Sequence, residues 1–360
     1  MTESINILQR LDKYVDLLVA QNGSDLHFSA GNLPAIRVEN KIVQMKGEKV
    51  IAQSDMEALV KKLLSEEKKE QLYKERQVDF SLEVKKDARF RGNIFFQKGN
   101  LSMALRLIPG KVKSLKELNI PEAIYSFAEK KQGLFLVVGP NGNGKSTTLA
   151  ALVEYINTNK QQHIVTLEDP IEYVYTSKQS LVEQREISLD AVDFQNALKS
   201  CFRESVDVIL VGELRDLETI SMAMTAAETG HLILGTLHTN DSVQTIDRII
   251  DIFPPYQQNQ IRCQLANVLL GVVSQRLVKR SGGGRIPAME ILIKNKAIEN
   301  LIRQNQTHQI PNVLETSSDS GMISMDRYLA ELVKNGEVDL EESRQYVSDE
   351  SVFEMLLESK

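Results

Sequence analysis

The stretch GPNGNGKSTTLA, at residues 139–150, constrains the fold more than any other part of this chain. It fits the pattern G-x-x-x-x-G-K-[S/T], in which backbone N–H groups surround phosphate oxygens, the lysine reaches the outer phosphates and the hydroxyl binds Mg²⁺. The apolar run LFLVVG precedes it and a helical pattern through Asn157 follows. We therefore predict a bound nucleoside triphosphate with Mg²⁺. The residues predicted to bind it are Gly139, Pro140, Asn141, Gly142, Asn143, Gly144, Lys145, Ser146 and Thr147, with Ser146 also a metal ligand.

Around this loop, apolar strands alternate with helical patterns. The strands are LFLVVG, HIVTLED, VDVILVGE and HLILGTLHT, a loop follows the second, and helices are expected near 191–203 and over 216–229. Such alternation predicts an α/β core with a parallel sheet covered by helices on both faces. After Pro254-Pro255 the pattern becomes mostly helical, with a flexible turn at SGGGR. The core is expected over 121–290, and a helical C-terminal region over 291–360.

Acidic residues stand where two of these strands end. Glu213 closes VDVILVGE, a position from which a carboxylate reaches the metal of a phosphate site. Glu168 and Asp169 close HIVTLED, where a carboxylate can orient or deprotonate an attacking water. Adjacent residues on a strand point in opposite directions, so only one of this pair is expected to face the nucleotide. We favour Glu168, with Asp169 capping the turn before Pro170.

Two of the five histidines, His231 and His238, flank the strand HLILGTLHT. An imidazole near the terminal phosphate could sense its presence through a hydrogen bond. Their spacing of seven residues places them on opposite faces of an unbroken strand, so they need not share a role. Taken alone, each histidine is more often structural.

The first 107 residues predict a separate α+β domain. Residues 5–21 have helical spacing, and SDLHFSAGNLPAIRVENKIVQM alternates as short strands with turns at Gly31–Asn32 and Glu39–Asn40. Ser54 and Glu57 are expected to form a capping box for one long helix that ends near residue 75. The segments VDFSLEV, RFRGNIFFQ and LSMALRLI then read as three antiparallel strands. Pro109-Gly110-Lys111 opens a predicted linker over 108–120.

Arginines occur on the last two of those strands. Arg89 and Arg91 share a face at period two, and Arg106 lies on the following strand. Such arginines are usually solvated or paired with carboxylates. The alternative is an arginine finger that stabilises the charge on a nucleotide held elsewhere.

Bulk composition excludes several classes of protein. With 43 basic and 49 acidic residues, the formal charge of −6 gives no general attraction to nucleic acid or anionic lipid. The two cysteines, Cys201 and Cys263, lack zinc-site spacing and suit the reducing cytosol. No apolar run approaches the roughly 18–20 residues of a membrane span, and the N-terminus lacks a signal-peptide core. We expect a soluble, cytoplasmic protein.

The ordered motifs GPNGNGKSTTLA, TLEDPIEY, VDVILVGELRDLETI, AAETGHLILGTLHT and IDRIIDIFPPYQQNQIR resemble those of secretion-type ATPases. Within that superfamily they are most similar to the type IV pilus retraction ATPases, and GSDLHFSAGNLPAIRV and ARFRGNIFFQ resemble their N-terminal domain. The resemblance implies a PAS-like N-terminal domain, a RecA-like P-loop NTPase core, and a homohexameric ring with ATP between neighbouring subunits. It implies catalytic roles for Glu168, Glu213 and His238, with Glu213 also a metal ligand and His238 favoured over His231. It also implies catalytic roles for three arginines, Arg89, Arg91 and Arg106.

The same resemblance implies a function. The protein would hydrolyse ATP to power pilus retraction from the cytoplasmic side of the inner membrane, with a membrane platform protein and paralogous pilus ATPases as partners and without nucleic acid. Assembly and type II secretion ATPases often carry a four-cysteine zinc module, which two cysteines do not provide, so the retraction type is favoured over the assembly type. Pilus assembly, type II secretion and accessory retraction remain the alternatives within the family.

Two features depart from the family pattern. Ser205-Val206 stands where an Asp-Pro pair often precedes the third strand of the core. In AIENLIRQ, residues 297–304, Glu299 replaces an arginine and Gln304 a glutamate of a segment tied to retraction.

Two other classes of function are open to test. A RecA-like DNA translocase would need a basic path with aromatic residues, and none stands out in a chain without tryptophan. A non-catalytic nucleotide switch would bind nucleotide without turnover. The presence of Lys145, Glu168 and Glu213 argues against this class.

Overall fold

The computed structural model describes residues 7–21, 23–38, 41–85, 88–108, 110, 112–317 and 320–359. The turn at Glu39–Asn40 and two residues of the predicted linker, Pro109 and Lys111, lie outside the described residues. The chain divides into two compact units, which are described separately. The first is Met1–Lys111 with Glu172–Val174, and the second is Val112–Ile171 with Tyr175–Lys360.

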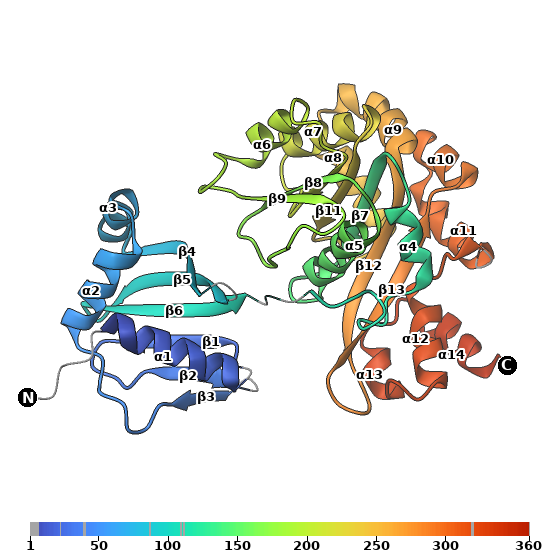
Figure 1. The fold of residues 1–360 in the computed structure, drawn as a ribbon. Coiled ribbons are helices and arrows are strands. Elements are labelled where there is room, and N and C mark those ends of the chain that lie inside the picture. Colours follow the sequence, from blue (N-terminus) through green and yellow to red (C-terminus); the bar gives the residue numbers. More distant parts are fainter. Residues whose placement is uncertain are drawn as a thin grey trace, which may run out of the picture. The chain divides into compact units, whose positions relative to one another are not determined.

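The first unit is an antiparallel sheet with helices packed on one face. The strand order is β3-β2-β1-β6-β5-β4 (Figure 1). The strands are β1 Asp25–Ser29, β2 Ala35–Val38, β3 Lys41–Gln44, β4 Gln77–Lys85, β5 Ala88–Gln97 and β6 Asn100–Ile108. Alternate strand residues such as Phe28, Phe90 and Leu105 form a buried core with Tyr14 and Leu59 of the helices. The predicted α+β architecture is therefore confirmed.

The helices of this unit are α1 Ile7–Ala20, α2 Gln53–Leu63 and α3 Glu66–Glu75. The prediction of one long helix capped by Ser54 and Glu57 is wrong. The backbone of Leu64 is extended, which buries its side chain, and the Ser65 side chain caps a new helix by accepting from Lys68 N at 3.3 Å. The helix α2 is instead capped through Asp55, whose carboxylate accepts a hydrogen bond from Ala52 N at 3.0 Å.

The second unit is built on a seven-stranded sheet with the order β13-β12-β7-β11-β10-β8-β9. Its strands are β7 Gly133–Val138, β8 His163–Glu168, β9 Leu181–Glu186, β10 Val208–Val211, β11 Leu232–Leu237, β12 Leu269–Lys279 and β13 Arg285–Ile293. All neighbouring pairs are parallel except β12 and β13, which form an antiparallel hairpin closed by the SGGGR turn.

Two expectations for this sheet are corrected. β9 occupies part of the segment expected to be a loop, and the hairpin β12–β13 occupies a region expected to be mostly helical. Both arise from pairing with distant strands: β9 pairs with β8, and β12 pairs with β7 more than 130 residues earlier in the chain. The sheet is parallel at its centre, and its one antiparallel strand lies at an edge.

Helices cover both faces of this sheet, as predicted (Figure 1). Alternate residues of β7 divide between two cores: Leu134 and Leu136 join one, and Phe135 and Val137 join the other. One face carries α4 Glu122–Ala128 and α5 Lys145–Asn159. The other face carries α6 Phe194–Cys201, α7 Leu217–Glu228, α8 Ser242–Asp251, α9 Pro255–Val268 and α10 Lys296–Arg303.

The C-terminal part of the second unit is helical. It comprises the short 3₁₀ helix η1 Thr307–Gln309, followed by α11 Ile310–Thr316, α12 Met325–Lys334, α13 Leu340–Arg344 and α14 Glu350–Glu358. Val278 and Ile286 of the hairpin pack with Leu329 and Phe353 of these helices in a separate small core. Among the described residues, none of the helices combines the length and apolar character that crossing a membrane requires.

Candidate functional site

Four adjacent parallel strands, β7, β11, β10 and β8, bring the predicted site residues of the second unit to one edge of the sheet. Gly139 follows β7, His238 follows β11, Glu213 stands two residues beyond β10, and Glu168 is the last residue of β8. Ligands of open α/β sheets bind at this carboxyl edge, because the strand ends and the following loops form a crevice there. The edge is therefore the candidate nucleotide site.

The loop Gly139–Gly144 connects β7 to α5, which begins at Lys145. Lys145 is only 7% exposed, and its Nζ donates to the carbonyl oxygens of Gly139 at 2.7 Å and Pro140 at 3.1 Å. Ser146 and Thr147 are half-buried in the first turn of α5. The N–H groups in the first turn of a helix and the positive end of its dipole attract an anion at this position. The loop thus has the form of a phosphate cradle.

His238 lies between Lys145 and Glu213. Its Nδ1 is 3.3 Å from Lys145 Nζ, and its Nε2 is 3.0 Å from Glu213 Oε1. A lysine ammonium only donates, so the tautomer that satisfies both contacts accepts at Nδ1 and donates from Nε2 to the carboxylate. Arg215 also pairs with Glu213 Oε1. Burial tends to raise the pKa of Glu213, but its contacts with Arg215 and His238 outweigh burial and lower it.

Glu168 is 7% exposed at the end of β8. Thr166, two residues earlier on the same strand, donates its hydroxyl to Glu168 Oε1 at 2.7 Å, and Gln184 Nε2 of β9 lies 3.3 Å from the same oxygen. These contacts hold one carboxylate oxygen in place. Asp169 is exposed.

His231 is separated from His238 by the whole length of β11. Its Nδ1 lies 3.1 Å from the carbonyl oxygen of Ala226, and its ring stacks edge-on against Phe202, with centroids 5.4 Å apart. The structure therefore places His231 at the edge of the sheet opposite His238, where it contacts Ala226 and Phe202.

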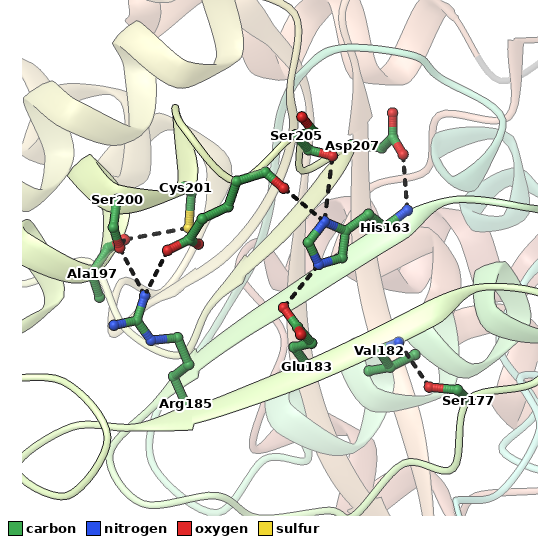
Figure 2. Close-up of polar contacts among 11 residues, drawn as sticks. His163, Ser177, Val182, Glu183, Arg185, Ala197, Ser200, Cys201, Ser205 and Asp207 are labelled. Carbon is green, nitrogen blue, oxygen red and sulfur yellow. Dashed lines mark hydrogen bonds and ion pairs between the residues drawn. The ribbon is translucent and has the colours of Figure 1, made fainter.

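A second polar cluster surrounds His163, at the start of β8 and so at the edge opposite Glu168 (Figure 2). The His163 Nδ1 lies 3.1 Å from Glu204 O, Nε2 lies 3.0 Å from Glu183 Oε2, and the backbone N donates to Asp207 Oδ2 at 2.8 Å. The departure Ser205-Val206 falls in this turn, where Ser205 has a φ of 54°. The cluster joins β8, β9 and the turn before β10 and does not reach the phosphate loop.

The three predicted arginines lie in the first unit. Arg91 of β5 lies opposite Arg106 of β6 in the strand register. Arg106 Nε donates to Asp25 Oδ1 at 3.0 Å. Arg37 of β2 approaches the other oxygen of Asp25 at 3.2 Å. Burial tends to raise the pKa of Asp25, but hydrogen bonds from Ser24 and Arg106 lower it overall. The action of Arg89, Arg91 and Arg106 on a nucleotide stays a prediction.

Residues of β12 also border the phosphate loop, and sequence reasoning missed them. Gln275 contacts the loop, and Arg276 Nη2 lies 3.2 Å from both the carbonyl and side-chain oxygens of Asn240, just beyond His238. The signal was available: LLGVVSQRLVK and RIPAMEILI are rich in β-branched residues and are separated by a glycine turn, a pattern typical of a hairpin.

The parallel sheet, the glycine loop and the polar carboxyl edge define a RecA-like P-loop NTPase core. The model of the Type II/IV secretion system protein family matches residues 2–283, and the chain belongs to that family. A type IV pilus retractation ATPase PilT from Pseudomonas aeruginosa is 43% identical over 325 residues, 90% of this chain and 94% of that protein. A twitching motility protein from Neisseria gonorrhoeae is 48% identical over 269 residues, 74% of this chain and 72% of that protein.

A solved structure has the same fold throughout. The crystal structure of the pilus retraction motor PilT with bound ADP matches with a TM-score of 0.90 and 42% sequence identity, covering 96% of this chain and 99% of that one. The predicted fold class, a RecA-like core with an N-terminal α+β domain of the PAS-like kind, is thereby confirmed.

Proposed function

We propose that this chain is an ATP-hydrolysing motor that powers retraction of type IV pili. The observation that carries the proposal is the carboxyl edge of the sheet. Four adjacent strands bring together there the glycine loop, His238, Glu213 and Glu168. Its support is similarity over most of the chain to a protein named a pilus retractation ATPase and to a retraction motor with bound ADP.

In the proposed reaction, the loop N–H groups and Lys145 hold the β- and γ-phosphates of ATP. A water attacks the γ-phosphorus, and ADP and phosphate are released. Glu168 orients this water or accepts its proton, a task suited to a buried carboxylate with one oxygen held by Thr166. The ammonium group of Lys145 has three donors, and Gly139 O, Pro140 O and His238 Nδ1 are within reach of all three, so at least one of these contacts must be released for Lys145 to bind a phosphate.

Magnesium fits the oxygen donors at this site. Mg²⁺ usually binds one or two protein oxygens, substrate phosphates and several waters. Ser146 in the first turn of α5 and Glu213, whose pKa is lowered, are the proposed ligands. Bound there, Mg²⁺ would neutralise charge that develops on the phosphates. Among the described residues no group of three or more His, Cys, Asp or Glu side chains could hold a metal, and this type of site does not need one.

We further propose a homohexameric ring in the cytoplasm, attached to the inner-membrane pilus machine through a platform protein and working with paralogous pilus ATPases. Arg89, Arg91 and Arg106 would add positive charge near the phosphates of a bound nucleotide. Loss of the γ-phosphate would then move the domains as rigid bodies.

Deleting the gene in its host and imaging the pili tests the direction of work. Retraction predicts hyperpiliated cells without twitching motility, whereas bald cells would indicate an assembly motor. Complementation with the wild type should restore motility and complementation with Glu168→Gln should not. If Glu168→Gln restored motility, hydrolysis at this site could not be the energy source.

Purified protein tests the site itself. A Glu213→Ala variant is expected to lose at least about 10²-fold in kcat, because the metal ligand and the partner of His238 are both removed. Normal hydrolysis by that variant would remove the site assignment. ATPase activity that required DNA would favour a translocase, and tight ATP binding without turnover would favour a nucleotide switch.

A further inference from the structure

Gln275 of β12 is 2% exposed and lies against the phosphate loop. Its Nε2 donates to the carbonyl oxygen of Asn143 at 2.6 Å, and its Oε1 accepts from the Thr148 hydroxyl at 2.8 Å. The first partner belongs to the loop and the second to α5. One buried side chain therefore joins a distant strand to both halves of the phosphate site.

The orientation of this amide is determined by its partners. A carbonyl oxygen only accepts, so the amino group of Gln275 must face Asn143. The amide oxygen then faces Thr148, whose hydroxyl is free to rotate and donate. The contact with Thr148 is buried and the contact with Asn143 is partly buried, and an unpaired polar atom in such a place is costly.

Asn143 itself is held from two directions. Its Oδ1 accepts from Leu277 N at 2.9 Å, and its Nδ2 lies 3.3 Å from the carbonyl oxygen of Pro140. Gln275 contributes its side chain and Leu277 its backbone N–H, and the two residues are two positions apart on β12. The side chain of Asn143 therefore braces the loop against the strand.

Two glycines of the loop let β12 approach this closely. A Cβ at Gly139 would lie 2.4 Å from the Gln275 carbonyl oxygen, and one at Gly144 would lie 2.9 Å from Gln275 Nε2. Both glycines have positive φ, 141° and 78°. The loop is thus shaped by β12 as much as by its own sequence.

We infer that Gln275 is a positioning residue that holds the loop ready for the β-phosphate before nucleotide binds. The inference rests on the proposed nucleotide site. A loop that is already held in its bound shape loses less conformational entropy on binding. The hydrogen bonds from β12 should therefore increase the affinity for nucleotide. Gln275 does not touch the reacting atoms in this account, and its loss should weaken binding more than turnover at saturating ATP.

The test compares Gln275→Met with the wild type in the full-length protein. Methionine keeps the length of the side chain and removes both hydrogen bonds. The Kd for ADP is expected to rise about tenfold, since the loss of two hydrogen bonds, one buried and one partly buried, has an effect on this scale. Binding of AMP, measured by competition, should change less than about twofold because AMP lacks the β-phosphate that the loop surrounds. The kcat at saturating ATP should also stay within about twofold.

A second variant separates affinity from folding. Gln275→Met leaves the Thr148 hydroxyl unpaired and should lower the Tm. Adding Thr148→Val removes that hydroxyl at nearly equal volume, so the Tm should recover while the Kd for ADP stays high. If ADP affinity recovered together with the Tm, the role of Gln275 would be structural only and the inference would be wrong.

The control is Gln264→Met on α9, where the Gln264 Nε2 donates to Glu228 at 3.0 Å on a different part of the unit. It should leave ADP binding unchanged. Wild-type protein that binds ADP, with a Gln275→Met variant that binds it equally well, would overturn this inference alone. Wild-type protein that failed to bind ADP would overturn the proposed function and the inference together.

Discussion

The imidazole of His238 connects the two charged groups of the site: its Nε2 lies 3.0 Å from Glu213 Oε1, while its Nδ1 lies 3.3 Å from Lys145 Nζ. A phosphate that draws Lys145 away therefore changes one of the two hydrogen bonds that orient the ring. We therefore predict that His238 couples phosphate binding in the loop to the position of the Glu213 carboxylate.

Replacement of His238 by alanine should reduce hydrolysis. We expect kcat to fall by about tenfold or more, because Glu213 loses the hydrogen bond that orients it. Steady-state phosphate release measures the effect. The matched control is His231→Ala at the other end of β11, where the ring contacts Ala226 O and Phe202; this variant should keep near-normal turnover. Equal losses in the two variants would contradict the assignment.

Replacement of Glu168 by glutamine should block chemistry and spare binding. The amide keeps the shape of the side chain and an acceptor for Thr166, but it is a far weaker base. We expect kcat to fall by about 10²–10⁴-fold with the Kd for ADP nearly unchanged. Asp169→Asn, at the adjacent exposed position, should have a much smaller effect. A larger loss from Asp169→Asn would reverse the roles of the two carboxylates.

The two cysteines should differ in reactivity. Cys201 is fully buried, its Sγ donates to Ala197 O at 3.3 Å, and burial raises its pKa to about 12 (Figure 2). Cys263 is exposed. Because the thiolate is the reactive form, a maleimide near pH 8 should label only Cys263 in the native protein and both cysteines after denaturation. Native Cys263→Ser protein should remain unlabelled, and rapid labelling of that variant would contradict the burial of Cys201.

Glu290 should make stability depend on pH. Burial raises its pKa, as do the charges of Asp241 and Asp326, although its Oε1 accepts from Ser242 N at 2.8 Å. A folded-state pKa above the unfolded value of 4.5 gives stability that is complete below that value and is lost as pH rises through the folded pKa. Every tenfold difference between the acid dissociation constants of the folded and unfolded states corresponds to about 1.4 kcal/mol in the free energy of unfolding.

The variant Glu290→Gln removes that ionisation and keeps an acceptor for Ser242. Its Tm should therefore exceed that of the wild type increasingly as pH rises above 4.5, as followed by thermal unfolding. A difference in Tm that did not change with pH would show that ionisation of Glu290 has no part in stability.

Much of the second unit could be predicted because its signals are local. The strand before the glycine loop, the helix after it and the carboxylates after later strands all follow from short patterns. The sequence did not reveal β9 in the same way, since that strand is recognised by its pairing with β8. A hairpin pattern was present for β12 and β13, but the place of β12 beside β7 depends on a pairing across more than 130 residues. For the same reason the single helix expected over residues 54–75 was wrong: the break at Leu64 comes from burial of that side chain in the core.

The amino-acid sequence by itself determined the strand–loop–helix with the phosphate-loop pattern and the acidic residues at the ends of neighbouring strands, because both depend on residues close together in the chain. Only the tertiary structure decided that His238 joins Lys145 to Glu213 and that Gln275 holds Asn143, 132 residues away. Such contacts depend on strand order, and strand order results from packing the whole sheet between its helices.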